Sequence, residues 1–329
     1  MGRNYFLFKS GTLKRKENTI LIESEDGKRS IPVEDVDSIY IFGKVVFNTE
    51  FIDFLAQKKI PLHFFNYYEY YSGSFYPREY LDSGFLLVRQ VEHYLDPEKR
   101  MDIAKEIVQS ASDNILKNLK YYHKRIEEIG DYIKRIEKEL SGLDGCGTTR
   151  ELMSVEGRVR DIYYSSFNEF LKLEEPFIKR ERRPPTNPIN ALISFGNSLL
   201  YATILSEIYR SQLNPTISYL HEPGTRRFSL SLDFSEIFKP IIVDRVIFKL
   251  INNRMLDEED FDRELNYCYL TDSGRKKFVR EYDEKLSQTI EHRRLKRHVS
   301  YKRLIRLECY KLIKHLLGDE RYKGFRIWW

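Results

Sequence analysis

The sequence predicts an α+β protein, in which a small N-terminal β domain of hairpins, residues 1–78, precedes a larger all-helical domain, residues 96–329. Two observations support this prediction. Short β-rich runs separated by turn residues fill the first 75 residues, whereas apolar residues recur at helical spacing from about residue 80 onward. The chain has 329 residues, which is enough for two domains of ordinary size. Residues 79–95 are predicted to link them.

The N-terminal part alternates strand-like runs with turn signals. Ser10-Gly11 and Asp26-Gly27 are typical of tight turns between paired strands. Asn48 can begin a short helix over residues 51–58, and a further strand is expected at 60–65. The earlier runs predicted as strands are 5–8, 19–22, 30–33 and 38–42.

Eight aromatic side chains crowd into residues 64–76. Two interpretations are open: the rings stack on nucleic-acid bases, or they pack a hairpin or a subunit interface. Packing is the commoner role of clustered aromatic residues.

The helical part begins after Asp96-Pro97-Glu98, which is a good helix start. Apolar residues then recur at helical spacing over residues 103–140 and predict one long amphipathic helix, or two joined end to end. Gly142, Gly145 and Gly147 interrupt this pattern. They are interpreted as a connector and not as a phosphate loop, because no Gly-Lys-Ser/Thr follows. The next helix is expected to be capped by Thr148 or Thr149.

Composition limits the class of protein. Charged residues make up 32% and hydrophobic residues 41%, so the chain is folded and not disordered. The net charge is +5, and residues 1–75 carry 10 basic and 10 acidic side chains, so the excess lies in the remainder. Three distant cysteines, Cys146, Cys268 and Cys309, argue against a disulfide framework and suggest a reducing cytoplasm. No membrane-spanning segment is predicted.

Four polar residues in the middle of the chain are candidates for a metal site. Glu156 and His221 each lie in an apolar framework, where a polar side chain is costly unless it has a partner. Asp233 and Glu236 are three positions apart, so on a helix both carboxylates would share one face. Carboxylate oxygens and an imidazole nitrogen suit a hard divalent cation, with Mn²⁺ accepting the imidazole more readily than Mg²⁺.

Each of these residues also has a structural explanation. Asp233 and Glu236 have the spacing of a capping box at a helix start. A single histidine is more often a hydrogen-bonded structural residue than a ligand, and a single glutamate is more often a solvated charge. Other catalytic motifs are absent from the sequence, including Gly-x-Ser-x-Gly, the Walker loop and His-Glu-x-x-His.

Four motifs in a fixed order then indicate a family. The most specific is the stretch 183–201, which contains Thr186-Asn187-Pro188-Ile189-Asn190-Ala191. The others are Val155-Glu156-Gly157 with tyrosines after it, Leu220-His221, and the run 229–240 with Val243-Asp244-Arg245. Together they resemble the CRISPR-associated spacer-acquisition integrase and endonuclease, the first-named family of the Cas series.

This resemblance implies roles for the four candidate residues. In the family, residues matching Glu156 and His221 and an acid in the segment 233–236 bind a divalent metal, Mg²⁺ or Mn²⁺, for phosphodiester chemistry. Glu236 is the favoured metal ligand here. Asp233 would then support the metal ligands without binding the metal, or it would cap the helix. The second acid is aspartate in some relatives and glutamate in others, so both assignments remain open.

The resemblance also implies a function and partners. The expected activity is insertion of short DNA fragments into a CRISPR repeat array. A homodimer is expected, with the dimer contact in the N-terminal β domain, together with a complex with the second small CRISPR-associated acquisition protein. DNA is the expected substrate.

Two basic runs could bind DNA phosphates. The first is residues 179–183, which contains Arg183. The second is residues 293–298, and it continues to Lys302 and Arg303. At helical spacing the charges of the second run do not form one stripe, which indicates a kink or an exposed arm. Its candidate residues are Arg293, Arg294, Lys296, Arg297, Lys302 and Arg303.

Two other classes of protein compete with the enzyme. A non-catalytic nucleic-acid-binding scaffold would explain the basic runs and the aromatic segment. A helical structural or oligomerisation protein would explain the striped segment 103–140. Metal-dependent activity that requires His221 would favour the enzyme over both.

Overall fold

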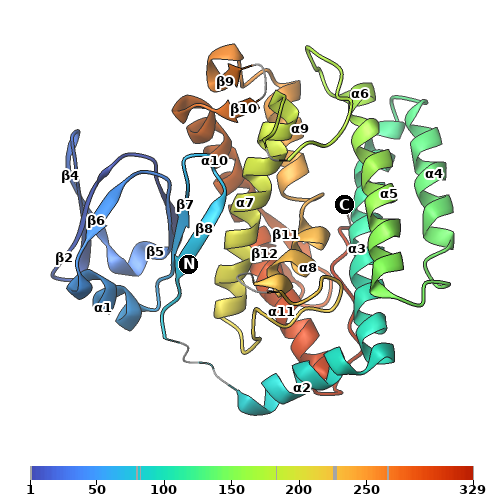
Figure 1. The fold of residues 1–329 in the computed structure, drawn as a ribbon, viewed down its shortest axis with the longest axis horizontal. Coiled ribbons are helices and arrows are strands. Elements are labelled where there is room, and N and C mark those ends of the chain that lie inside the picture. Colours follow the sequence, from blue (N-terminus) through green and yellow to red (C-terminus); the bar gives the residue numbers. More distant parts are fainter. Residues whose placement is uncertain are drawn as a thin grey trace. The chain divides into compact units, whose positions relative to one another are not determined.

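The computed structural model describes residues 2–78, 81, 83–182, 184–224, 228–264 and 267–328. The chain divides into two compact units, Met1–Asp82 and Ser83–Trp329. The first is rich in strands and the second is mostly helical (Figure 1). This arrangement confirms the predicted α+β class.

The first unit contains two four-stranded sheets. One has the order β4-β3-β2-β6, with β2 Gly11–Lys16, β3 Thr19–Ser24, β4 Gly27–Pro32 and β6 Val45–Phe47. The other has the order β1-β5-β7-β8, with β1 Arg3–Leu7, β5 Val36–Ile41, β7 Leu62–Phe65 and β8 Tyr71–Phe75. The antiparallel pairs β2–β3, β3–β4 and β7–β8 are hairpins, which agrees with the predicted domain of hairpins, although β2 lies outside the runs predicted as strands. The parallel pairs β1–β5, β5–β7 and β2–β6 were not predicted, because a β-rich run does not specify which strand it pairs with.

Helix α1, Thr49–Lys58, closes the core of this unit. The Asn48 side chain accepts a hydrogen bond from Phe51 N at 3.0 Å, which confirms the predicted helix start. Phe51, Phe54 and Leu55 are buried in one cluster with apolar residues of the strands. The apolar face of a short helix therefore covers the sheets.

The aromatic segment lies on the β7–β8 hairpin. Phe65 is buried and stacks on Phe42 with ring centroids 4.5 Å apart, so the packing interpretation holds for this ring. Tyr67 and Tyr68 are 73% and 51% exposed, and for them both interpretations remain open.

The second unit is built around α7, Pro188–Tyr209. This helix contacts α8, α9, α11 and β10, and Figure 1 shows it in the middle of the helical part. The surrounding helices are α2 Gly84–Leu95, α3 Pro97–His123, α4 Ile129–Ser141, α5 Thr149–Ser165, α6 Phe167–Phe170, α8 Ser229–Phe238, α9 Val243–Asn252, α10 Asp272–Ser287 and α11 Tyr301–Leu316.

Two segments differ from the sequence prediction. Residues 84–95, predicted as linker, form α2, which Ser83 caps by accepting a hydrogen bond from Leu86 N at 3.2 Å. The striped segment forms α3 and α4, which pack against each other and are not joined end to end. The sequence between them, residues 124–128, contains no glycine or proline, so its apolar spacing continues through the turn.

Two short hairpins correct the prediction of an all-helical second domain. The first pairs β9, Phe261–Glu264, with β10, Tyr267–Leu270. The second pairs β11, Thr289–His292, with β12, Arg297–Ser300. Each strand has four residues, and β9, β11 and β12 are rich in polar side chains, so three of the four lack the apolar run from which strands are predicted.

Helix α7 also bears on the expected lack of a membrane segment. By length and composition it is the one helix among the described residues that could cross a membrane, a feature the sequence analysis overlooks. In the structure 78% of that stretch is buried inside the unit, as in the core helix of a globular protein.

Residues 322–328 run back along α3. The Asn114 side chain donates to Phe325 O at 3.0 Å and accepts from Ile327 N at 2.8 Å. The buried carboxylate of Glu308 accepts from Tyr322 Oη at 2.6 Å and from Phe325 N at 3.2 Å. This tail is therefore part of the core of the unit.

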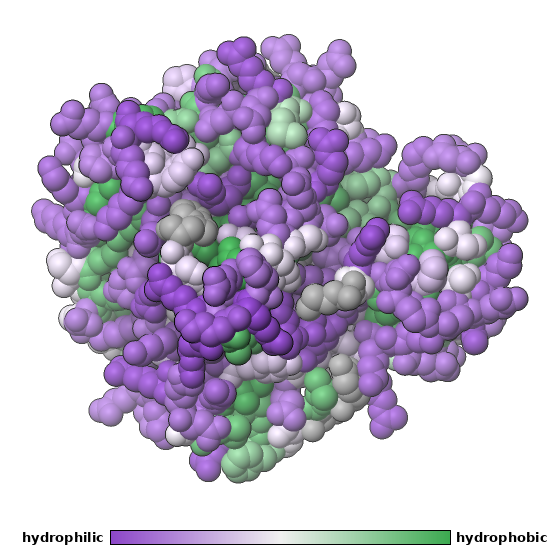
Figure 2. All heavy atoms as spheres, turned by 180° about the vertical axis from the view of Figure 1, so that it is seen from behind, coloured by the Kyte–Doolittle hydropathy of each residue, from purple (hydrophilic) through white to green (hydrophobic). Residues whose placement is uncertain are grey.

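Hydrophilic residues dominate the face of the molecule shown in Figure 2, and hydrophobic residues appear there as separate patches. The most exposed large apolar side chains of the second unit are Phe85, Leu95 and Ile178, at 62%, 70% and 84%. Single exposed apolar residues are common on soluble domains and identify no site by themselves.

Candidate functional site

Glu156 projects from the second turn of α5. Thr148 caps this helix: its hydroxyl accepts from Glu151 N at 3.3 Å, and the Glu151 carboxylate accepts from Thr148 N at 3.2 Å. Of the two predicted capping residues, Thr148 is therefore the correct one. Val155 and Val159 are buried on this helix. The Glu156 side chain is 22% exposed.

Asp233 lies inside α8 and is not a helix cap. The helix begins at Ser229, so the capping-box interpretation of Asp233 and Glu236 is wrong. Asp233 is fully buried, and its two oxygens accept from the backbone N of Tyr219 at 2.7 Å, Leu220 at 3.1 Å and His221 at 2.9 Å. A single carboxylate thus fixes the segment that ends in the histidine.

The same carboxylate orients the His221 ring, because its Oδ1 lies 2.8 Å from His221 Nδ1. A proton on Nδ1 leaves the lone pair of Nε2 available for another partner. Burial favours the neutral ring, but the hydrogen bond and the charge of Asp233 outweigh it and raise the pKa of His221. His221 is consequently a positioned imidazole at 18% side-chain exposure.

Glu156 and Glu236 meet at one guanidinium. Arg160 Nη2 lies 3.0 Å from Glu156 Oε1 and also forms a short ion pair with Glu236 Oε2. The other oxygen of Glu236, Oε1, accepts a hydrogen bond from Lys239 Nζ at 2.6 Å. The glutamates come from α5 and α8, so the fold brings together two residues that are distant in sequence.

The electrostatics of the two carboxylates differ. Burial raises the pKa of Glu156, and the neighbouring charge of Glu236 raises it further. Burial would also raise the pKa of Glu236, but Lys239, Arg160 and His221 together lower it below its ordinary value. Glu236 is therefore ionised at neutral pH, and His221 is close enough for their charges to interact.

The donor set of this site suits a hard divalent cation, since it offers two carboxylates and an imidazole with a free nitrogen. Among the residues that the structure describes, no three His, Cys, Asp or Glu side chains are grouped closely enough to hold a metal ion. Arg160 and Lys239 instead satisfy the carboxylates. The residue types fit a metal, and in the structure the Arg160 guanidinium lies between the two glutamates.

The sequence analysis missed Arg160, Lys239 and Asp244 as parts of the site. Arg160 is four positions after Glu156, and Lys239 is three after Glu236, so helical spacing carried the signal. Asp244 is buried, which raises its pKa to about 6, against the opposing charge of Arg160. The signal that could have found it is its place in the motif Val243-Asp244-Arg245, within an apolar run.

The basic candidates lie in several settings. Arg183 falls outside the described residues. Arg293, Arg294 and Lys296 lie in the exposed β11–β12 turn and Arg297 starts β12, so the run forms a hairpin and neither a kinked helix nor a free arm.

Several of these cations have partners within the protein. Arg294 pairs with Glu320 at 2.6 Å, and the Cζ of Arg293 lies 5.5 Å from the ring centre of Trp328. Lys302 is buried, which leaves it little surface for a phosphate, and Arg303 lies over the Tyr310 ring. Lys296 and Arg297 are exposed and are the better candidates for DNA contact.

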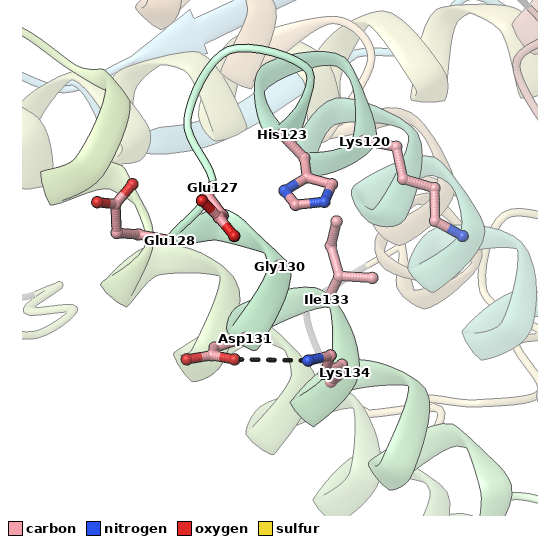
Figure 3. Close-up of a pocket in the computed structure, with 8 residues that line it drawn as sticks. All are labelled: Lys120, His123, Glu127, Glu128, Gly130, Asp131, Ile133 and Lys134. Carbon is pink, nitrogen blue, oxygen red and sulfur yellow. Dashed lines mark ion pairs between the residues drawn. The ribbon is translucent and has the colours of Figure 1, made fainter.

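An open pocket of about 600 Å³ lies elsewhere, between the end of α3 and the start of α4 (Figure 3). His123 and Lys120 line it from α3, and Asp131 and Lys134, which form an ion pair at 3.9 Å, line it from α4. None of the predicted site residues lines this pocket.

Comparison with known proteins gives the family. The family model described as CRISPR associated protein Cas1 matches residues 5–284. A CRISPR-associated endonuclease Cas1 of Thermodesulfovibrio yellowstonii is 56% identical over 328 residues, which is 99% of this chain and 100% of that protein. A Cas1 protein of Thermotoga maritima has a solved structure with a TM-score of 0.90 and 45% identity, covering 98% of this chain and 100% of that one.

Two solved structures of lower identity have the same fold. A casposase bound to integration product has a TM-score of 0.85 and 23% identity, covering 98% of this chain and 92% of that one. A Cas6-RT-Cas1–Cas2 complex has a TM-score of 0.86 and 18% identity, covering 100% of this chain and 36% of that one. The family model and the relatives of high identity extend over most or all of the sequence, and the chain therefore belongs to the Cas1 family of CRISPR-associated endonucleases.

Proposed function

We propose that this protein is a divalent-metal-dependent DNA endonuclease and integrase that joins short DNA fragments into a CRISPR repeat array. The observation that carries the proposal is the meeting of Glu156 and Glu236 at one point, beside an imidazole that Asp233 holds in place. The casposase with the same fold is bound to an integration product, which agrees with strand joining. At 23% identity that likeness concerns the fold alone, so the proposal rests on the residues.

Glu156, Glu236 and His221 would hold Mg²⁺ or Mn²⁺. A bound cation stabilises the charge that builds on phosphate oxygens and lowers the pKa of a coordinated hydroxyl group. Asp233 fixes Nδ1 of His221 and so leaves Nε2 available as a ligand. Lys239, at 18% side-chain exposure, keeps Glu236 ionised and adds positive charge where a phosphate would approach.

One site of this kind supports two reactions. Water as the nucleophile hydrolyses a phosphodiester, and the 3′-hydroxyl of a DNA end joins two strands. Both reactions break one phosphorus–oxygen bond and form another, so they need the same carboxylates and imidazole. The substrate, rather than a second set of residues, would determine which reaction occurs.

The proposal is tested with branched DNA that carries a free 3′-hydroxyl. We expect cleavage and strand joining in Mn²⁺ or Mg²⁺ but not in EDTA, and loss of both in His221→Ala. The matched control is His123→Ala, which removes an imidazole from α3 that lines the separate pocket. Activity that survives both EDTA and His221→Ala would instead support a non-catalytic DNA-binding scaffold with a contaminating nuclease.

The proposed partners follow from the same family. A Cas6-RT-Cas1–Cas2 complex shares this fold, and we propose that this chain likewise assembles with a Cas2 protein and with DNA. A homodimer through the first unit is part of the proposal. Light scattering of the protein alone, and with a separately purified Cas2 protein, measures both assemblies.

The β11–β12 hairpin is the proposed DNA contact outside the metal site. Its exposed Lys296 and Arg297 would meet phosphates, and each phosphate contact contributes about one unit to the salt dependence of binding. We expect Lys296→Gln with Arg297→Gln to weaken DNA binding at low salt and to lower the salt slope by about two. Binding measured by fluorescence anisotropy between low and moderate salt provides the slope.

The control for this experiment removes two other surface lysines. Lys134→Gln with Lys138→Gln changes the net charge equally, on helix α4. If both double variants reduce the slope by the same amount, the hairpin is not a specific contact. If only the hairpin variant reduces it, the basic turn is part of the DNA interface.

A further inference from the structure

The Arg160 side chain occupies the point where the two glutamates meet. Its guanidinium is only 9% exposed. It donates from Nε to Glu156 Oε1 at 3.1 Å, and its Nη2 lies 3.0 Å from the same oxygen. The same Nη2 pairs with Glu236 Oε2. One nitrogen of one side chain thus binds both of the carboxylates proposed to hold the metal.

The remaining contacts of this guanidinium are weaker. Its Nη1 is buried and has no hydrogen-bond partner among the described residues. The Tyr164 ring centre lies 5.9 Å from Cζ, and the charge of Asp244 acts on the guanidinium less strongly than the charges of the two glutamates. The hydrogen bonds that hold the guanidinium therefore come from the two glutamates.

Two buried carboxylates at one point repel each other and lose hydration, so both remain ionised only beside a compensating cation. A divalent metal supplies such a charge, and so does a guanidinium. Lys239 contributes a second positive charge, but it contacts Glu236 alone. Among the described cations at this point, Arg160 is the one that contacts both carboxylates at once.

We propose that Arg160 is a built-in counter-ion that holds Glu156 and Glu236 in place before the metal binds, and that it therefore competes with the divalent cation for their oxygens. This inference rests on the proposed function, because it presumes that these carboxylates bind a metal. It adds that the protein sets its own metal affinity: the site is stable without metal, and metal binds more weakly than it would to bare carboxylates.

The opposite role makes the opposite prediction. If Arg160 only positions the carboxylates for the metal, its loss disorders the site and weakens metal binding. If it competes, its loss strengthens metal binding, because a positive charge next to a divalent ion is removed. The sign of the change in Mn²⁺ affinity therefore distinguishes the two roles without any measurement of activity.

The experiment is a calorimetric titration of the full-length protein with Mn²⁺ for wild type, Arg160→Gln and Arg158→Gln. Arg158 is the matched control, because it lies on the same helix, is 53% exposed and pairs with Glu139 at 2.7 Å. We expect Arg160→Gln to bind Mn²⁺ about tenfold more tightly than wild type. Arg158→Gln should bind as wild type does.

Thermal unfolding in EDTA and in Mn²⁺ provides the second measurement. Arg160→Gln should melt below wild type in EDTA, and Mn²⁺ should raise its melting temperature by more than it raises that of wild type. If this variant does not fold in either buffer, Arg160→Lys takes its place, since an ammonium retains the charge but lacks the paired Nε and Nη2 with which Arg160 donates to Glu156 and Glu236. Its Mn²⁺-induced rise should also exceed that of wild type.

The outcomes separate the two proposals. If wild type does not bind Mn²⁺, the proposed function and this inference both fail. If wild type binds Mn²⁺ and the folded Arg160 variants bind it equally or more weakly, the proposed function stands and the counter-ion role is wrong.

Discussion

Glu156→Gln is expected to slow DNA cleavage and strand joining by at least about a thousandfold, because the metal contributes several kcal/mol to the transition state and an amide binds it poorly. The substitution keeps the shape of the side chain and removes its charge. Arg160 then has one carboxylate, Glu236, left to pair with. Glu236→Gln should have an effect of similar size.

The control is Asp161→Asn, which makes the same change from carboxylate to amide at an exposed position of the same helix. It should leave both rates unchanged. The rates are measured in Mn²⁺ on branched DNA, with circular dichroism to show that each variant is folded. Full activity in Glu156→Gln would remove this residue from the metal site and refute the assignment.

Asp233→Ala is expected to cost the protein about 3–5 kcal/mol of unfolding free energy, together with most of its activity. The buried carboxylate accepts from three backbone N–H groups and from the His221 ring, and alanine would leave all of these donors without an acceptor. The segment ending in His221 would then lose its anchor to α8. Urea unfolding measures the first effect, and the DNA-joining assay measures the second.

Asp233→Asn refines this experiment, because an amide retains one acceptor oxygen while its NH₂ group faces donors. In wild type, one carboxylate oxygen accepts from Tyr219 N and Leu220 N, and the other contacts His221 N and Nδ1. The single amide oxygen of asparagine can serve only one of these two groups of donors. The stability of this variant should fall between wild type and Asp233→Ala. If Asp233→Ala unfolds at the same urea concentration as wild type, the carboxylate does not hold the segment.

The sequence predicted much of the site because its residues lie in ordered motifs. The metal assignments of Glu156, His221 and Glu236 are still proposals, but the structure brings the two glutamates together and places His221 within range of the charge of Glu236. The support of Asp233 for His221 agrees with the role that the sequence analysis gave it. What the sequence could not show is the shared guanidinium, because a pairing across 76 positions depends on the packing of α5 and α8.

The fold was predicted best where the signal is local. The capping residues Asn48 and Thr148 begin helices as expected, since a cap depends on a few neighbouring residues. The parallel pairing of β1 with β5 depends on strands more than 25 residues apart, and local sequence does not encode it. Two helices over 103–140 were one of the predicted alternatives, but the turn that packs α3 against α4 was not predicted, because it carries no breaking residue.

The tail along α3 has a consequence for synthesis on the ribosome. Ile327 and Asn114 are 213 positions apart, so the core around α3 remains incomplete until residues 322–328 have been translated. The strands of the first unit all lie before residue 76, and this unit can therefore fold while the rest is still being made. A nascent chain would thus present a finished β unit long before its helical unit, whose core is complete only after residues 322–328 have been translated.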